Sequence, residues 1–150
     1  MTGPGRRRGE WSVRASVIAC ALMVGAGASG HPIAPGDIVD DALQAGELNR
    51  LEVEARAGIA MDFRLDHGHL DVGLRVLGPG GETLGTVENV LRRTDPLTLT
   101  VIVERTGTQR VEVWLRSPRA GPVRFRLSLG DARPAADADR LRLEAQQLRV

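Results

Sequence analysis

The sequence lacks tyrosine and lysine altogether, and it is poor in aromatic residues and in cysteine. Aromatic residues make up only 3% of the chain, so an aromatic platform that stacks bases or sugars is not expected. The single cysteine, Cys20, excludes an intramolecular disulfide. Because it lies in an apolar N-terminal run, the rest of the chain has no thiol for catalysis or for a cysteine-ligated zinc. The 20 basic residues, all arginine, nearly balance 19 acids, so no strong field favours nucleic acid.

The composition suits one packed domain with short extensions. Hydrophobic residues make up 42% of the 150 residues, which is too many for a disordered chain. We divide the chain into a signal peptide (1–30), a lead-in (31–46), a β-sandwich domain (47–130), and a linker with a C-terminal helix (131–150).

The first thirty residues have the pattern of a secretory signal peptide. The basic stretch "RRRGEWSVR" precedes "ASVIACALMVGAGASG", which is apolar and ends in small residues. The expected location is therefore exported, either periplasmic or extracellular. The apolar run is shorter than the roughly 20 residues that span a bilayer, and an uncleaved membrane anchor is the alternative. Without residues 1–30 the chain carries 16 arginines and 18 acids, a formal charge of −2.

Cleavage of this segment is the first testable prediction. Small residues precede His31, so we expect signal peptidase to cut after Ala28 or Gly30. N-terminal sequencing of the exported protein should read from Ser29 or His31. A product that still begins near Met1 would contradict the prediction.

From residue 48 to residue 130 the dominant hydrophobic period is two, which is typical of half-buried strands. Strands are expected at 49–57, 60–66, 70–77, 83–87, 96–104, 109–116 and 123–130, with Gly- and Pro-rich turns between them. This pattern predicts an all-β fold, an antiparallel jelly-roll-like β-sandwich, with a barrel as the related alternative. The expected core residues are Val72, Leu74, Val76, Leu99, Val101, Val113, Leu115 and Leu127.

The tail departs from the period of two. Leu141, Ala145 and Leu148 are spaced i, i+4 and i+7, which predicts an amphipathic helix, with Pro134 and Asp137 as start signals. The apolar stripe of this helix needs a partner, which is either the sandwich or something beyond the chain.

His67 and His69 form the one pattern that suggests metal chemistry. Residues i and i+2 of a strand point to the same side, and Asp66 or Asp71 would add a carboxylate ligand. A catalytic zinc site needs three protein ligands, and the third histidine, His31, lies at the signal junction.

The simpler interpretation is a strand end, in which Gly68 turns the chain and both imidazole rings lie in solvent. Replacing both histidines by alanine is then expected to leave folding and metal content unchanged. Asp40, Asp41, Asp62 and Asp66 are expected to be solvated charges rather than an acid–base pair. No catalytic, cofactor-binding or metal-binding residue is predicted, and no cofactor is expected.

Four stretches resemble the bacterial pre-peptidase C-terminal-like domain, in order, over residues 46–130. They are "GELNRLEVEARAG", "LDVGLRVLGPGGETLGTVE", "ERTGTQRVEVWLRS" and "GPVRFRLSL". The resemblance implies a jelly-roll-like β-sandwich with a role in binding, targeting or secretion. Val111 and Phe125 stand where the family has tyrosines. Gly78 stands where the family often has an acid, so the calcium site of some relatives is not implied.

A narrower resemblance is to exported proteins in which this domain precedes tetratricopeptide repeats and a caspase-like CHAT domain. The phrase "LGDARPAADADRLRLEAQQ" is similar to the junction in those proteins. No catalytic residue is implied for this chain.

Two functions of different classes follow. The first is an exported, non-catalytic binding or accessory module that contacts a protein or cell-envelope partner, and the membrane only through an uncleaved N-terminal segment. The alternative is a small metal-binding protein or metal-dependent hydrolase that uses His67 and His69.

Overall fold

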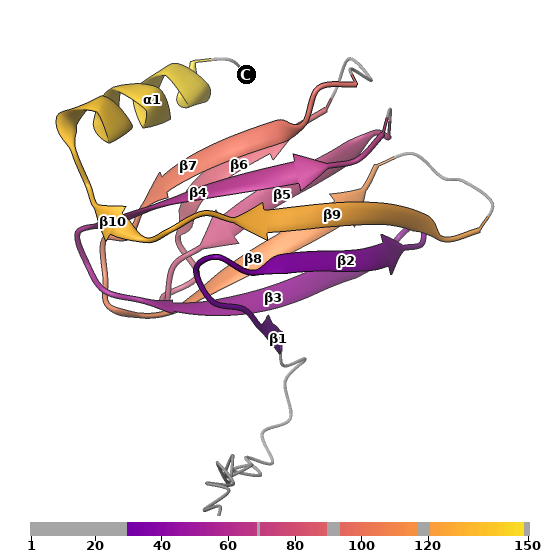
Figure 1. Ribbon diagram of the computed structural model, residues 1–150, viewed down its shortest axis with the longest axis horizontal. Helices are drawn as coiled ribbons and strands as arrows, with labels where there is room; N and C mark the ends of the chain where they lie inside the picture. Colours follow the sequence, from indigo (N-terminus) through magenta and orange to yellow (C-terminus); the bar gives the residue numbers. More distant parts are fainter. Residues whose placement is uncertain (1–29, 69, 90–93, 117–120, 149–150) are drawn as a thin grey trace, which may run out of the picture.

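The structure, a computed structural model, describes residues 30–68, 70–89, 94–116 and 121–148 (Figure 1). The expected signal peptide therefore lies outside the described residues. In chain order, the elements are β1 (His31–Pro32), β2 (Ile38–Leu43), β3 (Leu48–Ala55), β4 (Ile59–Asp66), β5 (Val72–Leu77), β6 (Thr83–Glu88), β7 (Leu97–Ile102), β8 (Gly107–Leu115), β9 (Val123–Leu129), β10 (Arg133–Pro134) and α1 (Asp137–Gln147). No helix in the described ranges has the length and apolar character needed to cross a bilayer.

The strands form two sheets that face one another. One sheet has the order β1-β3-β8-β5-β6, and the other contains β7, β4, β9, β2 and the short β10. In the second sheet β4 pairs with β7 along one side, and with β9 and then β10 along the other. All pairings are antiparallel except the two-residue contact of β1 with β3. The prediction of two antiparallel sheets from alternating short strands is confirmed.

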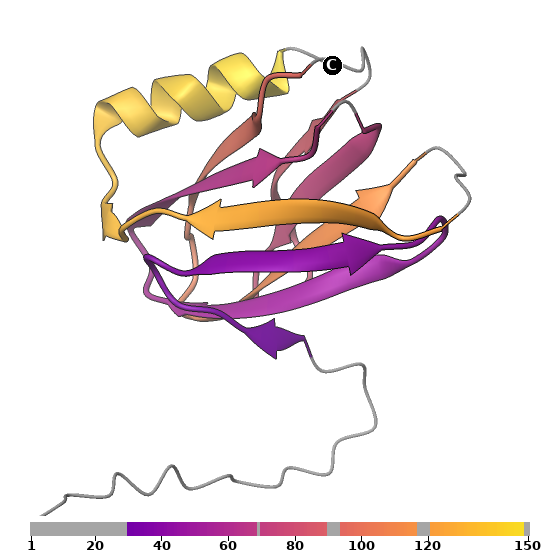
Figure 2. The same cartoon turned by 45° about the vertical axis from the view of Figure 1, so that its right-hand side comes forward.

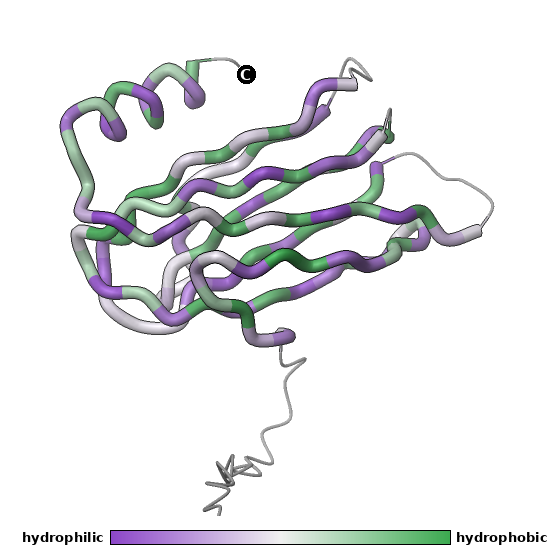
Figure 3. The backbone as a smooth tube through the Cα atoms, in the orientation of Figure 1, coloured by the Kyte–Doolittle hydropathy of each residue, from purple (hydrophilic) through white to green (hydrophobic). Residues whose placement is uncertain are grey.

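The core lies between the sheets and is built from the alternate residues of each strand (Figure 3). All eight predicted core residues are buried, and Leu74, Val76, Val101 and Val113 have no exposed surface. Phe63 and Phe125, the only phenylalanines of the chain, complete the filling from β4 and β9. The period of two therefore identified the correct face of each strand, because a shift by one residue would have turned these side chains into solvent.

The segment 31–46, expected to be a lead-in, supplies two strands to the sheets. β2 pairs with β9 along its whole length, from Ile38 opposite Ser128 to Leu43 opposite Val123. The alternation is hard to detect here because Asp41 occupies a position between the inward-facing Val39 and Leu43. The Asp41 carboxylate is exposed, and its Oδ2 accepts a 2.7 Å hydrogen bond from the Asn49 side chain of β3.

The predicted C-terminal helix is present as α1, and it begins at Asp137 as expected. Figures 1 and 2 show it lying along one side of the sandwich, where it contacts β7 and β6. Of the two partners expected for its apolar stripe, the sandwich does not cover Leu141 or Leu148. Leu141 is 65% exposed and Leu148 84% exposed, whereas Asp139 is buried.

The rotation of α1 is explained by polar anchors at its start. Asp139 accepts a 2.8 Å hydrogen bond from the Ala136 backbone N–H and a second one from Arg133. Arg133 Nη1 also lies 3.2 Å from Asp62 Oδ2 on β4. Further along, the Gln146 side chain reaches the Thr98 carbonyl of β7. These contacts turn the face with Asp139 toward the sheet and leave the apolar stripe outside.

We predict that Asp139→Ala will loosen the helix from the sandwich. The helix would lose the side chain that caps its first turn, which costs about 1 kcal/mol, and Arg133 would lose a partner. Amide hydrogen exchange within α1 should accelerate while exchange in β3 and β8 stays unchanged. The control is Asp137→Ala, an exposed acid in the same turn. Equal exchange in the two variants would contradict the anchoring role.

Candidate functional site

His67 comes directly after β4 and is 3% exposed, so the expectation that its ring lies in solvent was wrong. Its Nε2 lies 3.0 Å from the carbonyl oxygen of Asp95, which precedes β7. Its Nδ1 lies 3.4 Å from the side-chain nitrogen of Asn89, which follows β6. The side-chain nitrogen of Asn89 also donates a 2.8 Å hydrogen bond to the Leu70 carbonyl. His67 therefore joins the loop between β4 and β5 to the loop between β6 and β7 at one end of the sandwich.

These partners determine which ring nitrogen carries the proton. A carbonyl oxygen can only accept, so Nε2 of His67 donates to Asp95 and Nδ1 accepts from Asn89. A metal ligand needs a free nitrogen lone pair, and here the lone pair of Nδ1 is directed at the Asn89 amide. A metal site at His67 would therefore need a ring whose two nitrogens already have hydrogen-bond partners within the protein.

The remaining proposed ligands do not gather around His67. His69 lies outside the described residues, and His31 is exposed on β1 in the sheet opposite β4. Among the described residues, no group of three or more His, Cys, Asp or Glu side chains is arranged to hold a metal ion. Gly68 turns the chain, as predicted, with a φ of 49° that favours glycine.

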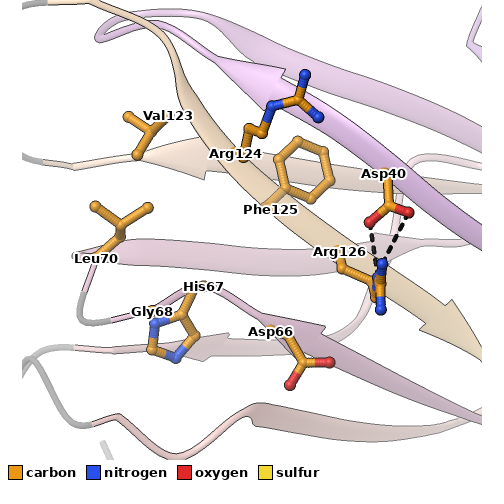
Figure 4. Close-up of a pocket in the computed structure, with 9 residues that line it drawn as sticks. All are labelled: Asp40, Asp66, His67, Gly68, Leu70, Val123, Arg124, Phe125 and Arg126. Carbon is orange, nitrogen blue, oxygen red and sulfur yellow. Dashed lines mark hydrogen bonds and ion pairs between the residues drawn. The ribbon is translucent and has the colours of Figure 1, made fainter.

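A shallow groove lies between the first half of β9 and the turn that follows β4 (Figure 4). The residues that line it are Asp40, Asp66, His67, Gly68, Leu70, Val123, Arg124, Phe125 and Arg126. In the close-up, His67, Gly68 and Leu70 form one wall, and the residues of β9 form the other. This groove is the candidate binding site.

A row of alternating charges crosses three strands at the groove. Asp66 of β4 stands opposite Arg126 of β9, and Asp40 of β2 stands on the other side of Arg126. Arg126 donates two hydrogen bonds to Asp40, at 2.7 and 3.1 Å. Asp66 is also 3.4 Å from Arg64 on its own strand.

The ion pair of Arg126 with Asp40 shifts the pKa of both groups. The hydrogen bonds from Arg126 hold the pKa of Asp40 below its usual value, and the carboxylate raises the pKa of Arg126. The stabilisation from a carboxyl with a lowered pKa is present above its unfolded pKa and is lost as the pH falls through the folded value. Because both groups are exposed, the contribution to stability is small.

Arg124 is a groove residue that the sequence analysis did not single out. Its strand neighbour on β2 is Ala42, which offers no charge. No ion pair joins its guanidinium to another residue in the described ranges. The stretch "VRFRLSL" already places two arginines on one face of a strand. The neighbouring strands show that Arg126 forms an ion pair with Asp40, whereas Arg124 forms no ion pair among the described residues and acts on Asp40 only at longer range.

The outer face of the other sheet carries a second polar cluster. Glu112 of β8 is buried there and pairs with Arg75 of β5, while Arg50 of β3 lies 3.8 Å away. The Arg75 guanidinium lies 5.7 Å from the centre of the Trp114 ring. That ring covers Gly73, where a Cβ atom would overlap it. These charges satisfy one another, which is typical of a structural cluster.

The other carboxylates that were considered as acid–base candidates also have structural partners. Asp62 accepts a 2.6 Å hydrogen bond from Thr100 and pairs with Arg133 near α1. It is separated from Asp40 by β9, which runs between β4 and β2. The structure does not bring these carboxylates together as a pair.

The sequence matches no family model and no curated protein. The fold does match solved structures. The pre-peptidase C-terminal domain of a collagenase from Bacillus anthracis superposes with a TM-score of 0.52 at 8% identity, over 67% of this chain and 94% of that domain. The fold is therefore pre-peptidase C-terminal-like. The family resemblance of residues 46–130 is confirmed at the level of the fold.

A second match has the same architecture. PliG of Aeromonas hydrophila, a periplasmic lysozyme inhibitor of g-type lysozyme, superposes with a TM-score of 0.55 at 15% identity. The match covers 70% of this chain and 96% of the inhibitor. At such identities the similarity concerns the arrangement of strands and carries no residue of a site across.

Proposed function

We propose that this chain is an exported, non-catalytic module with a jelly-roll-like β-sandwich that binds a protein or cell-envelope partner by surface contact. The observation that carries the proposal is the pre-peptidase C-terminal-like fold, which a periplasmic lysozyme inhibitor shares over almost its whole length. That inhibitor acts on a protein, and the signal-like residues 1–30 agree with a related location for this chain.

The polar side chains at the groove support binding rather than catalysis. Asp40 and Asp66 face arginines, and both ring nitrogens of His67 have partners. A general acid or base must instead reach a substrate proton within hydrogen-bond distance. In this proposal the groove recognises a surface, and its charges determine which surface fits.

The proposed setting follows from the narrower resemblance of residues 129–147. We infer that the sandwich acts beside tetratricopeptide repeats and a CHAT domain in an exported protein. The exposed stripe of Leu141 and Leu148 on α1 is consistent with a helical neighbour in such an arrangement.

The proposal predicts saturable binding to an envelope component. The full chain with a C-terminal affinity tag is expressed in its source, crosslinked in intact cells, and recovered from separated envelope and cytoplasmic fractions. We expect one crosslinked protein in the envelope fraction whose yield saturates as expression rises. As a control, untagged chain expressed at the same time should compete for it. Recovery only from the cytoplasm, or a yield that never saturates, would contradict the proposed function.

A further inference from the structure

The groove is a gap in the ladder of the second sheet. β9 pairs with β2 from Val123 to Ser128, but its pairing with β4 ends at Asp66 opposite Arg126. Beyond Asp66 the chain leaves the sheet through His67 and the turn at Gly68. Among the described residues, the first residues of β9 therefore have a neighbouring strand on one side only.

The hydrogen bonds around the end of β9 show which backbone groups face the gap. The N–H and carbonyl of Leu129 bond to Asp37 and Gly36, on the β2 side. The N–H of Gly130 bonds to Asp62 of β4. Backbone groups of successive residues in an antiparallel strand point to opposite sides. Even-numbered residues of β9, including Arg124, therefore direct their N–H and carbonyl toward β4.

No strand of the described residues lies opposite Arg124 on the β4 side. The ladder position opposite it would be two residues after Asp66, which is Gly68, but the positive φ there turns the chain away. In the described ranges, no hydrogen bond joins the Arg124 backbone to the β4 side. An edge with a free donor and acceptor is a template for an added strand.

The charge pattern indicates what the added strand must carry. Two residues further along β9, on the same face as Arg124, Arg126 stands between the carboxylates of Asp40 and Asp66. In the next row, Arg124 has Ala42 on the β2 side and the gap on the other. Opposite charges directly across two strands stabilise their pairing. An acidic residue in the gap would give Arg124 the partner that Arg126 already has.

We propose that the groove binds an extended segment of a partner protein, which adds a short strand beside β9 and places an aspartate or glutamate opposite Arg124. This inference rests on the proposed function and assigns its binding site. The main-chain bonds to Arg124 give affinity, and the cross-strand charge pair gives specificity. Val123 and Leu70, which line the same groove, offer apolar contact to the flanking residues of the segment.

The test uses blocked five-residue peptides, acetyl-Thr-Val-Glu-Val-Thr-amide and the same peptide with lysine at the centre. Each is titrated into the exported protein, labelled with ¹⁵N and purified from the cells that make it. We expect the glutamate peptide to slow hydrogen exchange at the Arg124 amide, which faces the gap. Exchange at the Phe125 amide should not change, because the backbone N–H of Phe125 points to β2. The glutamate peptide should bind about fivefold more tightly than the lysine peptide, the ratio for one favourable against one unfavourable charge pair.

Arg124→Glu should reverse this preference, and Arg56→Glu is the matched control. Arg56 is an exposed arginine in the turn between β3 and β4, so its replacement makes the same change in net charge. The control should keep the wild-type preference. Equal affinity for the two peptides, no change at the Arg124 amide, or an unchanged preference in Arg124→Glu would each overturn the inference. If the crosslinking experiment still gives a saturable envelope partner, the proposed function stands and only the site is wrong.

Discussion

Replacing Leu74 by alanine should lower the free energy of unfolding by about 2–5 kcal/mol, which is the usual cost of emptying a buried leucine site. Leu74 has no exposed surface, and it lies on β5 between Val113 of β8 and Val87 of β6. Two strands hold it on either side and the second sheet covers it, so the surroundings have little freedom to collapse into the cavity.

The measurement is denaturant titration with the slope of the transition compared between variants. Ile38→Ala is the control, because Ile38 lies on β2 but is 62% exposed, and its loss should change stability by no more than about 0.5 kcal/mol. A loss under about 1 kcal/mol for Leu74→Ala would show that β5 does not face the core as described.

His67→Ala is expected to destabilise the protein by about 1–3 kcal/mol. The change would leave the Asn89 amide without one acceptor and the Asp95 carbonyl without its donor, and unsatisfied buried polar groups cost about that much. This expectation replaces the one drawn from the sequence, in which the residue was solvated and the substitution neutral.

Thermal melting with and without a chelator separates the structural role from a metal role. We expect His67→Ala to melt at a lower temperature than the wild type. Chelator should not change the melting temperature of either protein. His31→Ala, which removes an exposed histidine from β1, is the control and should melt like the wild type. If chelator lowers the wild-type melting temperature and leaves a His67→Ala/His69→Ala variant unaffected, the metal hypothesis is right.

The strands that could be predicted are those with one buried and one exposed face. β3 to β9 all coincide with expected segments, and their inward residues form the core. β2 was missed because Asp41 interrupts its apolar alternation, and β1 and β10 because two residues carry no period. These strands share one property: none has the several unbroken apolar repeats by which a period of two can be recognised.

The candidate site was predictable only in its position along the chain. The turn at Gly68 was expected, and the structure confirms it. The burial of His67 was not, because its partners Asn89 and Asp95 lie in another loop, 22 and 28 residues away. Which of the two possible partners the apolar stripe of α1 faces was left open by the sequence for a similar reason. The stripe of Leu141 and Leu148 is a local pattern, whereas Arg133 and Asp62 fix the orientation of the helix from outside it.

The sequence by itself determined that this protein is built of short antiparallel strands, which face of each strand is buried, and where the chain turns. These properties depend on neighbours two residues apart, so the local order of side chains is enough to predict them. Only the tertiary structure decided which strands lie side by side. That order pairs Arg126 with Asp40 and Asp66, and it leaves Arg124 facing the gap where β4 ends. The groove is therefore a property of strand order, which no local pattern specifies.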